Sequence, residues 1–218
     1  MTAEAATLDD LRIALAPAIA DAAIFDGWSD AAVAAAAPVA GVDPAAAAFA
    51  FRGGAMEMIA AWIASIDRAM AEALPPAALA ALPIRERIRR LVQFRLDAIV
   101  GTREALRRAL AIMAMPQNAA RALRLAGQSA DAMWRLAGDT ATDYNHYTKR
   151  VTLGTIYAAT LAVYAHDESE GFAETRAFLD RRIAGVMKFE KAKARILGPR
   201  DETISLTRLL GRLRYPAT

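Results

Sequence analysis

Apolar residues recur at helical spacing along almost the whole chain, and this pattern limits the fold more than any other feature. Side chains three or four positions apart share one face of an α-helix, so each predicted helix has an apolar face to bury. No convincing run alternates β-branched and polar residues as a half-buried strand does. The 218 residues suffice for one domain with a sizeable core. The sequence therefore predicts an all-α protein.

Helix caps and helix breakers divide this pattern into separate elements. Ser29 and Asp43 are typical N-cap residues, and Pro44 suits the first position of the helix after Asp43. Pro17 predicts a kink in the first helix. A later loop is predicted at Pro75, Pro76 and Pro83. The predicted helices cover approximately residues 7–24, 29–37, 43–52, 54–74, 84–100, 103–114, 117–136, 140–166, 172–197 and 203–214.

The order of these helices resembles the TetR-regulator fold, in which a three-helix helix-turn-helix unit precedes a larger ligand-binding bundle. The turn sequences at 25–28 and 40–42 fit that plan. The expected parts are a degenerate helix-turn-helix unit (1–54), a helical bundle (55–198) and a C-terminal amphipathic helix (199–218). The resemblance also implies a homodimer through the helices at 140–166 and 172–197. The apolar residues available for that contact are Ile156, Tyr157, Val163, Phe178, Val186 and Phe189.

The third predicted helix lacks the side chains that read DNA. Recognition helices use Arg, Lys, Asn or Gln on base edges and basic residues on phosphates. Residues 44–51 read Pro-Ala-Ala-Ala-Ala-Phe-Ala-Phe, which offers at most an apolar contact to a thymine methyl group. Residues 1–56 contain seven acidic and two basic side chains, a balance that repels a phosphate backbone. No nucleic-acid partner is expected, and a ligand-responsive repressor of TetR type is kept as the alternative function.

Composition and spacing exclude several kinds of catalytic site. The chain contains no cysteine, so it has no disulfide, thiol nucleophile or Cys-ligated metal centre. The two histidines, His146 and His166, would lie about 30 Å apart along one helix, too far to share a metal. No Glu-x-x-His pair, Gly-rich phosphate loop or nucleophile elbow is present. The sequence thus predicts no catalytic residue, metal or cofactor. The basic runs at 85–90 and 103–108 are interpreted as solvated helix faces.

The two ends of the sequence bear on its expected location. No signal peptide is visible, because Asp9 and Asp10 interrupt the first apolar stretch and no basic residue precedes it. The expected location is the bacterial cytoplasm, with peripheral association with the inner membrane. Residues 203–214 predict a basic amphipathic helix, which suits either a membrane surface or docking on its own bundle. Its expected membrane contacts are Leu206, Leu209, Leu210, Leu213, Arg208 and Arg212.

Residues 134–150 gather aromatic, acidic and basic side chains around a predicted helix start, where Thr140 and Asp143 have the spacing of a capping box. This stretch resembles the signature of the ubiquinone-biosynthesis accessory lipid-binding family, also called rpsU-divergently transcribed proteins. The matching residues are Gly138, Asp139, Thr142, Asp143, Asn145, Tyr147, Thr148 and Arg150, with Tyr144 in place of Phe. Residues 172–183 resemble the next helix of the family. His146 and Arg176 stand where family members commonly carry Trp.

The family resemblance implies a non-catalytic accessory protein with a lipid-binding bundle. It would bind a polyprenyl-quinone intermediate or another isoprenoid lipid and present it to the di-iron demethoxyubiquinone hydroxylase. Each apolar residue of the bundle is by itself typical of a core, but Met and Ala packing also suits a cavity. The candidate lipid-binding residues are Met56, Ile59, Trp62, Ile63, Phe94, Met113, Met133, Leu153 and Tyr157. The candidate partner-binding residues are Trp134, Asp139, Asp143, Tyr144, Asn145, His146, Tyr147 and Arg150.

Overall fold

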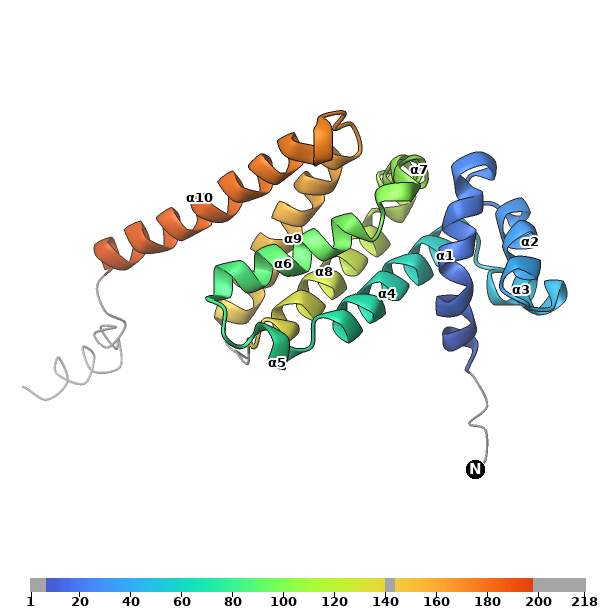
Figure 1. The fold of residues 1–218 in the computed structure, drawn as a ribbon, viewed down its shortest axis with the longest axis horizontal. Helices are drawn as coiled ribbons and strands as arrows, with labels where there is room; N and C mark the ends of the chain where they lie inside the picture. The colour runs from blue at the N-terminus through green and yellow to red at the C-terminus, as the bar shows by residue number, and fades with distance from the viewer. Residues whose placement is uncertain (1–6, 140–143, 198–218) are drawn as a thin grey trace, which may run out of the picture. The chain divides into compact units, whose positions relative to one another are not determined.

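The computed structural model describes residues 7–139 and 144–197, and every regular element in these two ranges is a helix (Figure 1). This confirms the predicted all-α class. The α-helices are α1 (Leu8–Asp26), α2 (Asp30–Val39), α3 (Pro44–Ala50), α4 (Ala55–Ala73), α5 (Pro76–Leu79), α6 (Ile84–Asp97), α7 (Arg103–Met113), α8 (Ala119–Leu136), α9 (Tyr144–Tyr164) and α10 (Ala173–Leu197). Short 3₁₀ turns lie at Val100–Thr102, Pro116–Asn118 and Glu170–Phe172.

The first three helices begin at side-chain caps. Thr7 and Asp10 form a capping box at the start of α1. Ser29 accepts a hydrogen bond from the Ala32 amide, and Asp43 accepts bonds from the first amides of α3. These caps satisfy amide groups that have no partner within the helix. The N-caps predicted at Ser29 and Asp43 are therefore confirmed.

Helix α1 joins the first three helices to the rest of the bundle, because it packs against both α2 and α4. The Arg12 side chain on α1 donates to the Ala50 carbonyl at the end of α3 over 2.8 Å and to Glu57 on α4 over 2.6 Å. Trp28 is buried, and its indole N–H donates to the Ala105 carbonyl on α7 over 3.0 Å. Residues 7–54 thus share one compact unit with the bundle. The described part of that unit is residues 7–139 and 144–179, and residues 180–197 belong to a second unit.

Helices α4, α6, α7, α8 and α9 form the larger bundle of the first unit (Figure 1). Its core is apolar and rich in alanine and methionine, as the helical pattern predicts. Fully buried members include Met58, Ile59, Met70, Leu91, Leu96, Ala130 and Met133. No helix in the described part of the chain is long and apolar enough to cross a bilayer.

Several helix ends differ from the sequence-based expectation. Helix α1 contains Pro17 in its interior, as predicted, but Pro76 begins the short helix α5 where a loop was predicted. Proline is compatible with the first turn of a helix because the amide there has no helical partner. Helix α6 ends at Asp97, and the next three-residue turn has 3₁₀ geometry. The predicted capping box at 140–143 and the predicted helix at 203–214 lie outside the described residues.

The basic runs on α6 and α7 are solvated only in part: Arg85, Arg90 and Arg107 are exposed, as predicted, but arginines of both runs also donate to main-chain carbonyls. Arg87 donates to the carbonyls of Ala80, Leu82 and Ala137, each over 2.8 Å. Arg107 donates to the Ala165 carbonyl at the end of α9 over 3.0 Å. These guanidinium groups satisfy main-chain acceptors at helix ends, where carbonyls lack helical partners.

Candidate functional site

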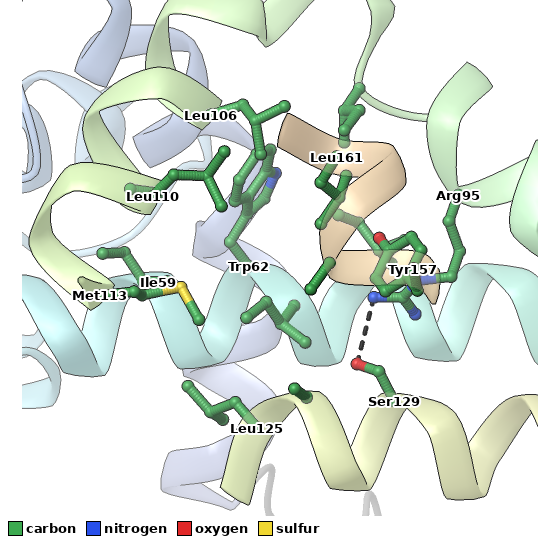
Figure 2. Close-up of a pocket in the computed structure, with 16 residues that line it drawn as sticks. Ile59, Trp62, Arg95, Leu106, Leu110, Met113, Leu125, Ser129, Tyr157 and Leu161 are labelled. Atoms are coloured by element: carbon green, nitrogen blue, oxygen red, sulfur yellow. Dashed lines mark hydrogen bonds between the residues drawn. The ribbon is translucent and has the colours of Figure 1, made fainter. Parts of the chain in front are cut away.

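An apolar pocket lies among α4, α6, α7, α8 and α9, within the first unit (Figure 2). Its walls are mostly aliphatic and aromatic side chains. The lining residues are Ile59, Trp62, Ile63, Ile66, Arg95, Ile99, Leu106, Ala109, Leu110, Met113, Leu125, Ala126, Ser129, Tyr157, Ala158 and Leu161. A concave apolar site with a few polar groups is the usual form of a small-molecule site.

The size of the pocket limits what it can enclose. Its volume is about 90 Å³. A single water needs only about 10–15 Å³, so the pocket has room for a small ring or a short run of isoprenoid carbons. A complete polyprenyl tail needs far more space than this. Any long tail must therefore leave the pocket or widen it.

Five of the nine predicted lipid-binding residues line this pocket: Ile59, Trp62, Ile63, Met113 and Tyr157. The other four do not. Met56, Met133 and Leu153 are buried elsewhere in the core, and Phe94 is half-buried. Helical periodicity identifies the buried faces, but it does not separate side chains that fill the core from side chains that surround a space.

The polar end of the pocket was not predicted from the sequence. Arg95 on α6 is 1% exposed and forms an ion pair with Asp67 on α4. It also donates to the Ser129 hydroxyl on α8 over 3.2 Å, and its guanidinium carbon lies 4.9 Å from the centre of the Tyr157 ring (Figure 2). Ser129 in turn donates to Asp67 over 3.3 Å. A charged side chain buried to this degree requires a compensating partner, which Asp67 supplies.

Two opposing effects act on the pKa of the Asp67 carboxyl group. Burial raises its pKa, while the charge of Arg95 and the hydrogen bonds from Arg95 and Ser129 oppose that rise. The Nε atom of Arg95 is buried and has no hydrogen-bond partner among the described residues. Arg95 and Ser129 both line the pocket, so this polar cluster forms part of its wall.

A second cluster joins the end of α8 to the start of α9. Asp139 accepts from Lys149 over 2.6 Å and from Arg150 over 3.2 Å, and Arg150 also pairs with Asp131 over 2.5 Å. The Trp134 indole donates to the Lys149 carbonyl over 3.0 Å. Burial raises the pKa of Asp139, but the Lys149 and Arg150 interactions outweigh it, so the pKa lies below its usual value. These contacts hold the two helices together.

The predicted partner-binding residues therefore fall into separate groups. The side chains of Asp139 and Arg150 are only 7% and 11% exposed, so they lie inside the ion-pair cluster. We expected these two side chains to form an accessible face, and the structure corrects this expectation. Asp139 and Arg150 form ion pairs with each other and with neighbouring charged residues. Tyr147 is 69% exposed, and so is Val151 one turn later on the same helix face. Asp143 and the side chains of Tyr144, Asn145 and His146 lie outside what the structure describes.

The predicted membrane-contact site lies in the part of the sequence after residue 197. Leu206, Leu209, Leu210, Leu213, Arg208 and Arg212, the expected membrane contacts, lie outside the described residues. Within residues 7–139 and 144–197, no group of three or more His, Asp or Glu side chains is arranged to hold a metal.

The fold defines the class of protein. A TetR transcriptional regulator from Nitrosomonas europaea has a similar structure, with a TM-score of 0.63 and 24% sequence identity over 80% of this chain and 96% of that chain. The chain is thus an all-α protein of TetR-like fold, as the helix order predicts.

The part of the chain that contains α8, α9 and much of α10 is similar in sequence to a known family. Residues 119–190 match the family model of COQ9. The mitochondrial ubiquinone biosynthesis protein COQ9 of Rattus norvegicus is 41% identical over 100 residues, which is 46% of this chain and 32% of that protein. The human protein is 38% identical over the same length, which is 46% of this chain and 31% of that protein. The family resemblance of residues 134–183 is confirmed.

The matched region is limited in extent. The chain spans about a third of the length of the curated relatives it matches. Those relatives, from rat to fission yeast, are all named as mitochondrial proteins. These names contradict the expected location in a bacterial cytoplasm.

Proposed function

We propose that this protein is a non-catalytic, lipid-binding accessory protein of ubiquinone biosynthesis. In this proposal it takes up a polyprenyl-quinone intermediate and presents it to the di-iron demethoxyubiquinone hydroxylase. A polyprenyl quinone is too apolar to leave a bilayer unaided, because water disfavours the exposed apolar surface. A protein pocket that shields part of the molecule lowers that cost.

The observation that carries the proposal is an apolar pocket to which the COQ9-like helices contribute part of the wall. Helices α8 and α9 lie within residues 119–190, and they supply Leu125, Ser129, Tyr157 and Leu161 to its wall. Six of the sixteen lining residues therefore come from the part of the chain that is similar to ubiquinone biosynthesis proteins. Its volume suits the ring or the first isoprenoid carbons of the ligand, with the remaining tail outside.

The exposed face of α9 supports a docking role. Tyr147 and Val151 present adjacent apolar surface just after the ion-pair cluster. Tyr is enriched at protein interfaces, where it combines a large apolar area with a polar tip. We assign the hydroxylase-facing surface to Tyr147, Val151 and Trp134, with Asp139 and Arg150 as its internal support. Homodimerisation through α9 and α10 is part of the same proposal, and light scattering at micromolar concentration tests it.

The alternative, a ligand-responsive repressor, is less well supported. The exposed residues of α3 are Pro44, Ala45, Ala46, Ala48 and Phe49, and none of their side chains carries a hydrogen-bond donor. Sequence readout in DNA grooves needs such donors and acceptors. At 24% identity, the similar TetR structure supports the fold alone. An electrophoretic shift with genomic DNA at low salt should therefore show no specific complex.

Quinone uptake by a cavity-filling variant tests the lipid-binding role. Ala109 is buried and lines the pocket, so Ala109→Leu places three additional carbons in the cavity. We expect this variant to bind a short-chain quinone at least tenfold more weakly than the wild type, measured by quenching of tryptophan fluorescence. Trp62 is suited to report binding because it lines the pocket.

Phe94→Leu is the matched control, because Phe94 is half-buried but does not line the pocket. This variant should bind the quinone like the wild type. Native mass spectrometry of the purified protein should also show copurified isoprenoid or other lipid. Folded protein that carries no lipid and takes up no quinone would contradict the proposal.

A further inference from the structure

We propose that the Arg95–Ser129–Tyr157 end of the pocket recognises a neutral hydrogen-bond acceptor on the ligand, of the kind that a quinone carbonyl oxygen provides. This inference rests on the proposed lipid-binding function and goes further, because it assigns the end that receives the headgroup and the charge of that headgroup. The opposite part of the pocket would receive the apolar tail.

The donor capacity of Arg95 is the first observation behind this assignment. A guanidinium group carries five N–H donors. The described contacts of Arg95 are the ion pair with Asp67, the hydrogen bond to Ser129, and a cation–π contact and a hydrogen bond with Tyr157. Its Nε atom is buried without a described hydrogen-bond partner. Leaving a buried donor unsatisfied is unfavourable, so an acceptor brought to this wall by a ligand would be stabilised.

The distribution of polarity in the pocket is the second observation. Arg95 and Ser129 lie side by side at one end, as Figure 2 shows, with Tyr157 against the guanidinium group. Leu110, Met113 and Leu125 lie away from this end and offer only apolar contacts (Figure 2). A ligand with one oxygen-bearing end and one hydrocarbon end therefore has a single favourable orientation.

The ion pair between Arg95 and Asp67 determines which headgroup charge the site favours. The positive charge of Arg95 is already compensated by Asp67, so the pair carries no net charge. An anionic headgroup, such as a fatty-acid carboxylate, would place a second negative charge near Asp67 in a weakly polar environment. Like charges at short distance are strongly unfavourable there. A neutral carbonyl accepts the hydrogen bond without this repulsion.

A comparison of three ligands on the intact chain tests the assignment. The ligands are a quinone with one isoprenoid unit, a hydrocarbon of matched size without oxygen, and a carboxylic acid with the same tail. Their affinities can be measured by displacement of an environment-sensitive apolar dye. We expect the wild type to bind the quinone about tenfold more tightly than either other ligand, as expected for one hydrogen bond to a charged group.

Arg95→Lys then removes the spare donor but keeps a cation opposite Asp67. We expect it to lower quinone affinity about tenfold and to leave hydrocarbon affinity unchanged. Arg90→Lys is the matched control, because Arg90 is exposed on the same helix and does not line the pocket, and it should change neither affinity. If Arg95→Lys fails to fold, the ligand comparison on the wild type still decides the question.

The outcomes separate this inference from the proposed function. A wild-type protein that binds hydrocarbon and quinone equally well retains lipid binding but overturns the headgroup assignment. Tighter binding of the carboxylic acid than of the quinone also overturns it, as does a folded Arg95→Lys variant with wild-type quinone affinity. A wild-type protein that binds none of the three ligands overturns both proposals.

Discussion

Trp134 and Lys149 contact each other in two ways across the junction of α8 and α9. The indole N–H of Trp134 donates to the main-chain carbonyl of Lys149 over 3.0 Å, and the Lys149 ammonium lies 5.4 Å from the centre of a Trp134 ring. The same ammonium pairs with Asp139 over 2.6 Å. One lysine therefore fixes an aromatic side chain and a loop carboxylate at once. This arrangement positions the start of the helix that carries Tyr147.

Trp134→Phe should destabilise the protein by about 1 kcal/mol, because it removes one hydrogen bond and leaves the Lys149 carbonyl without this donor. The free energy of unfolding from urea titration measures the effect. Leu123→Ala is a suitable control, since Leu123 is 75% exposed on the same helix. A surface change of this type should stay within about 0.5 kcal/mol of the wild type. Equal stabilities for the two variants would contradict the structural role of Trp134.

The stability contributed by Asp139 should depend on pH in the acid range. Its pKa is lower in the folded protein than its usual value, through Lys149 and Arg150 and against the effect of burial. Such a group stabilises the fold above its unfolded-state pKa, at about pH 4, and the contribution is lost as the pH falls through the folded-state value. We expect Asp139→Asn to be about 2 kcal/mol less stable than the wild type at pH 7.

The difference between wild type and Asp139→Asn should therefore shrink as the pH is lowered from 6 to 3. Urea titrations at several pH values measure it. Comparing the two proteins removes most of the contribution of Asp131, whose pKa is also lowered and which both proteins retain. A difference that grows on acidification would show that the sign of the pKa shift is wrong.

Tyr147→Ala should weaken binding to the hydroxylase by about tenfold or more, as expected for an interface anchor. Its effect on folding should be small because the side chain is 69% exposed. A pulldown with purified hydroxylase and a thermal melt of the same sample measure both properties. Leu123→Ala again serves as a matched exposed apolar control. Asp143→Lys tests the acidic part of the same predicted surface. Normal binding by both Tyr147→Ala and Asp143→Lys would rule out this docking surface.

Deleting residues 203–218 should reduce binding to anionic vesicles and leave the melting temperature nearly unchanged. The sequence places four leucines on one helical face and adds Arg208, Arg212 and Arg214, each worth about 1 kcal/mol near an anionic surface. Added salt should weaken the basic contribution. Flotation and a thermal melt on the same truncated protein distinguish the alternatives. A lower melting temperature with unchanged flotation would assign this segment to the core.

Local signals predicted the helices well where they were strong. Ser29 and Asp43 lie at the helix starts they predict, because capping depends on a side chain and the next three amides alone. The helix at Pro76 was missed, since proline breaks helices in their interior but is favoured in their first turn. The signal that could have found it was the proline pair itself.

The site was less predictable than the fold. Trp62 and Met133 both belong to apolar helix faces, yet only Trp62 lines the pocket. Arg95 gave no local indication of its burial, because its ion pair with Asp67 joins residues 28 positions apart. The same applies to Asp139 and Arg150, whose motif positions were identified but whose mutual pairing depends on how α8 meets α9. Such pairings are set by tertiary packing.

Trp28 and Trp62 contact each other, with tilted rings, between the first three helices and the bundle. The two ring centroids are 5.2 Å apart, and Trp62 also lines the pocket. Trp28 in addition holds α7 through Ala105, next to the pocket residue Leu106. The N-terminal helices thus support the two walls of the pocket that α4 and α7 form. Packing changes in the first three helices should therefore alter the shape of the pocket, although none of their residues lines it.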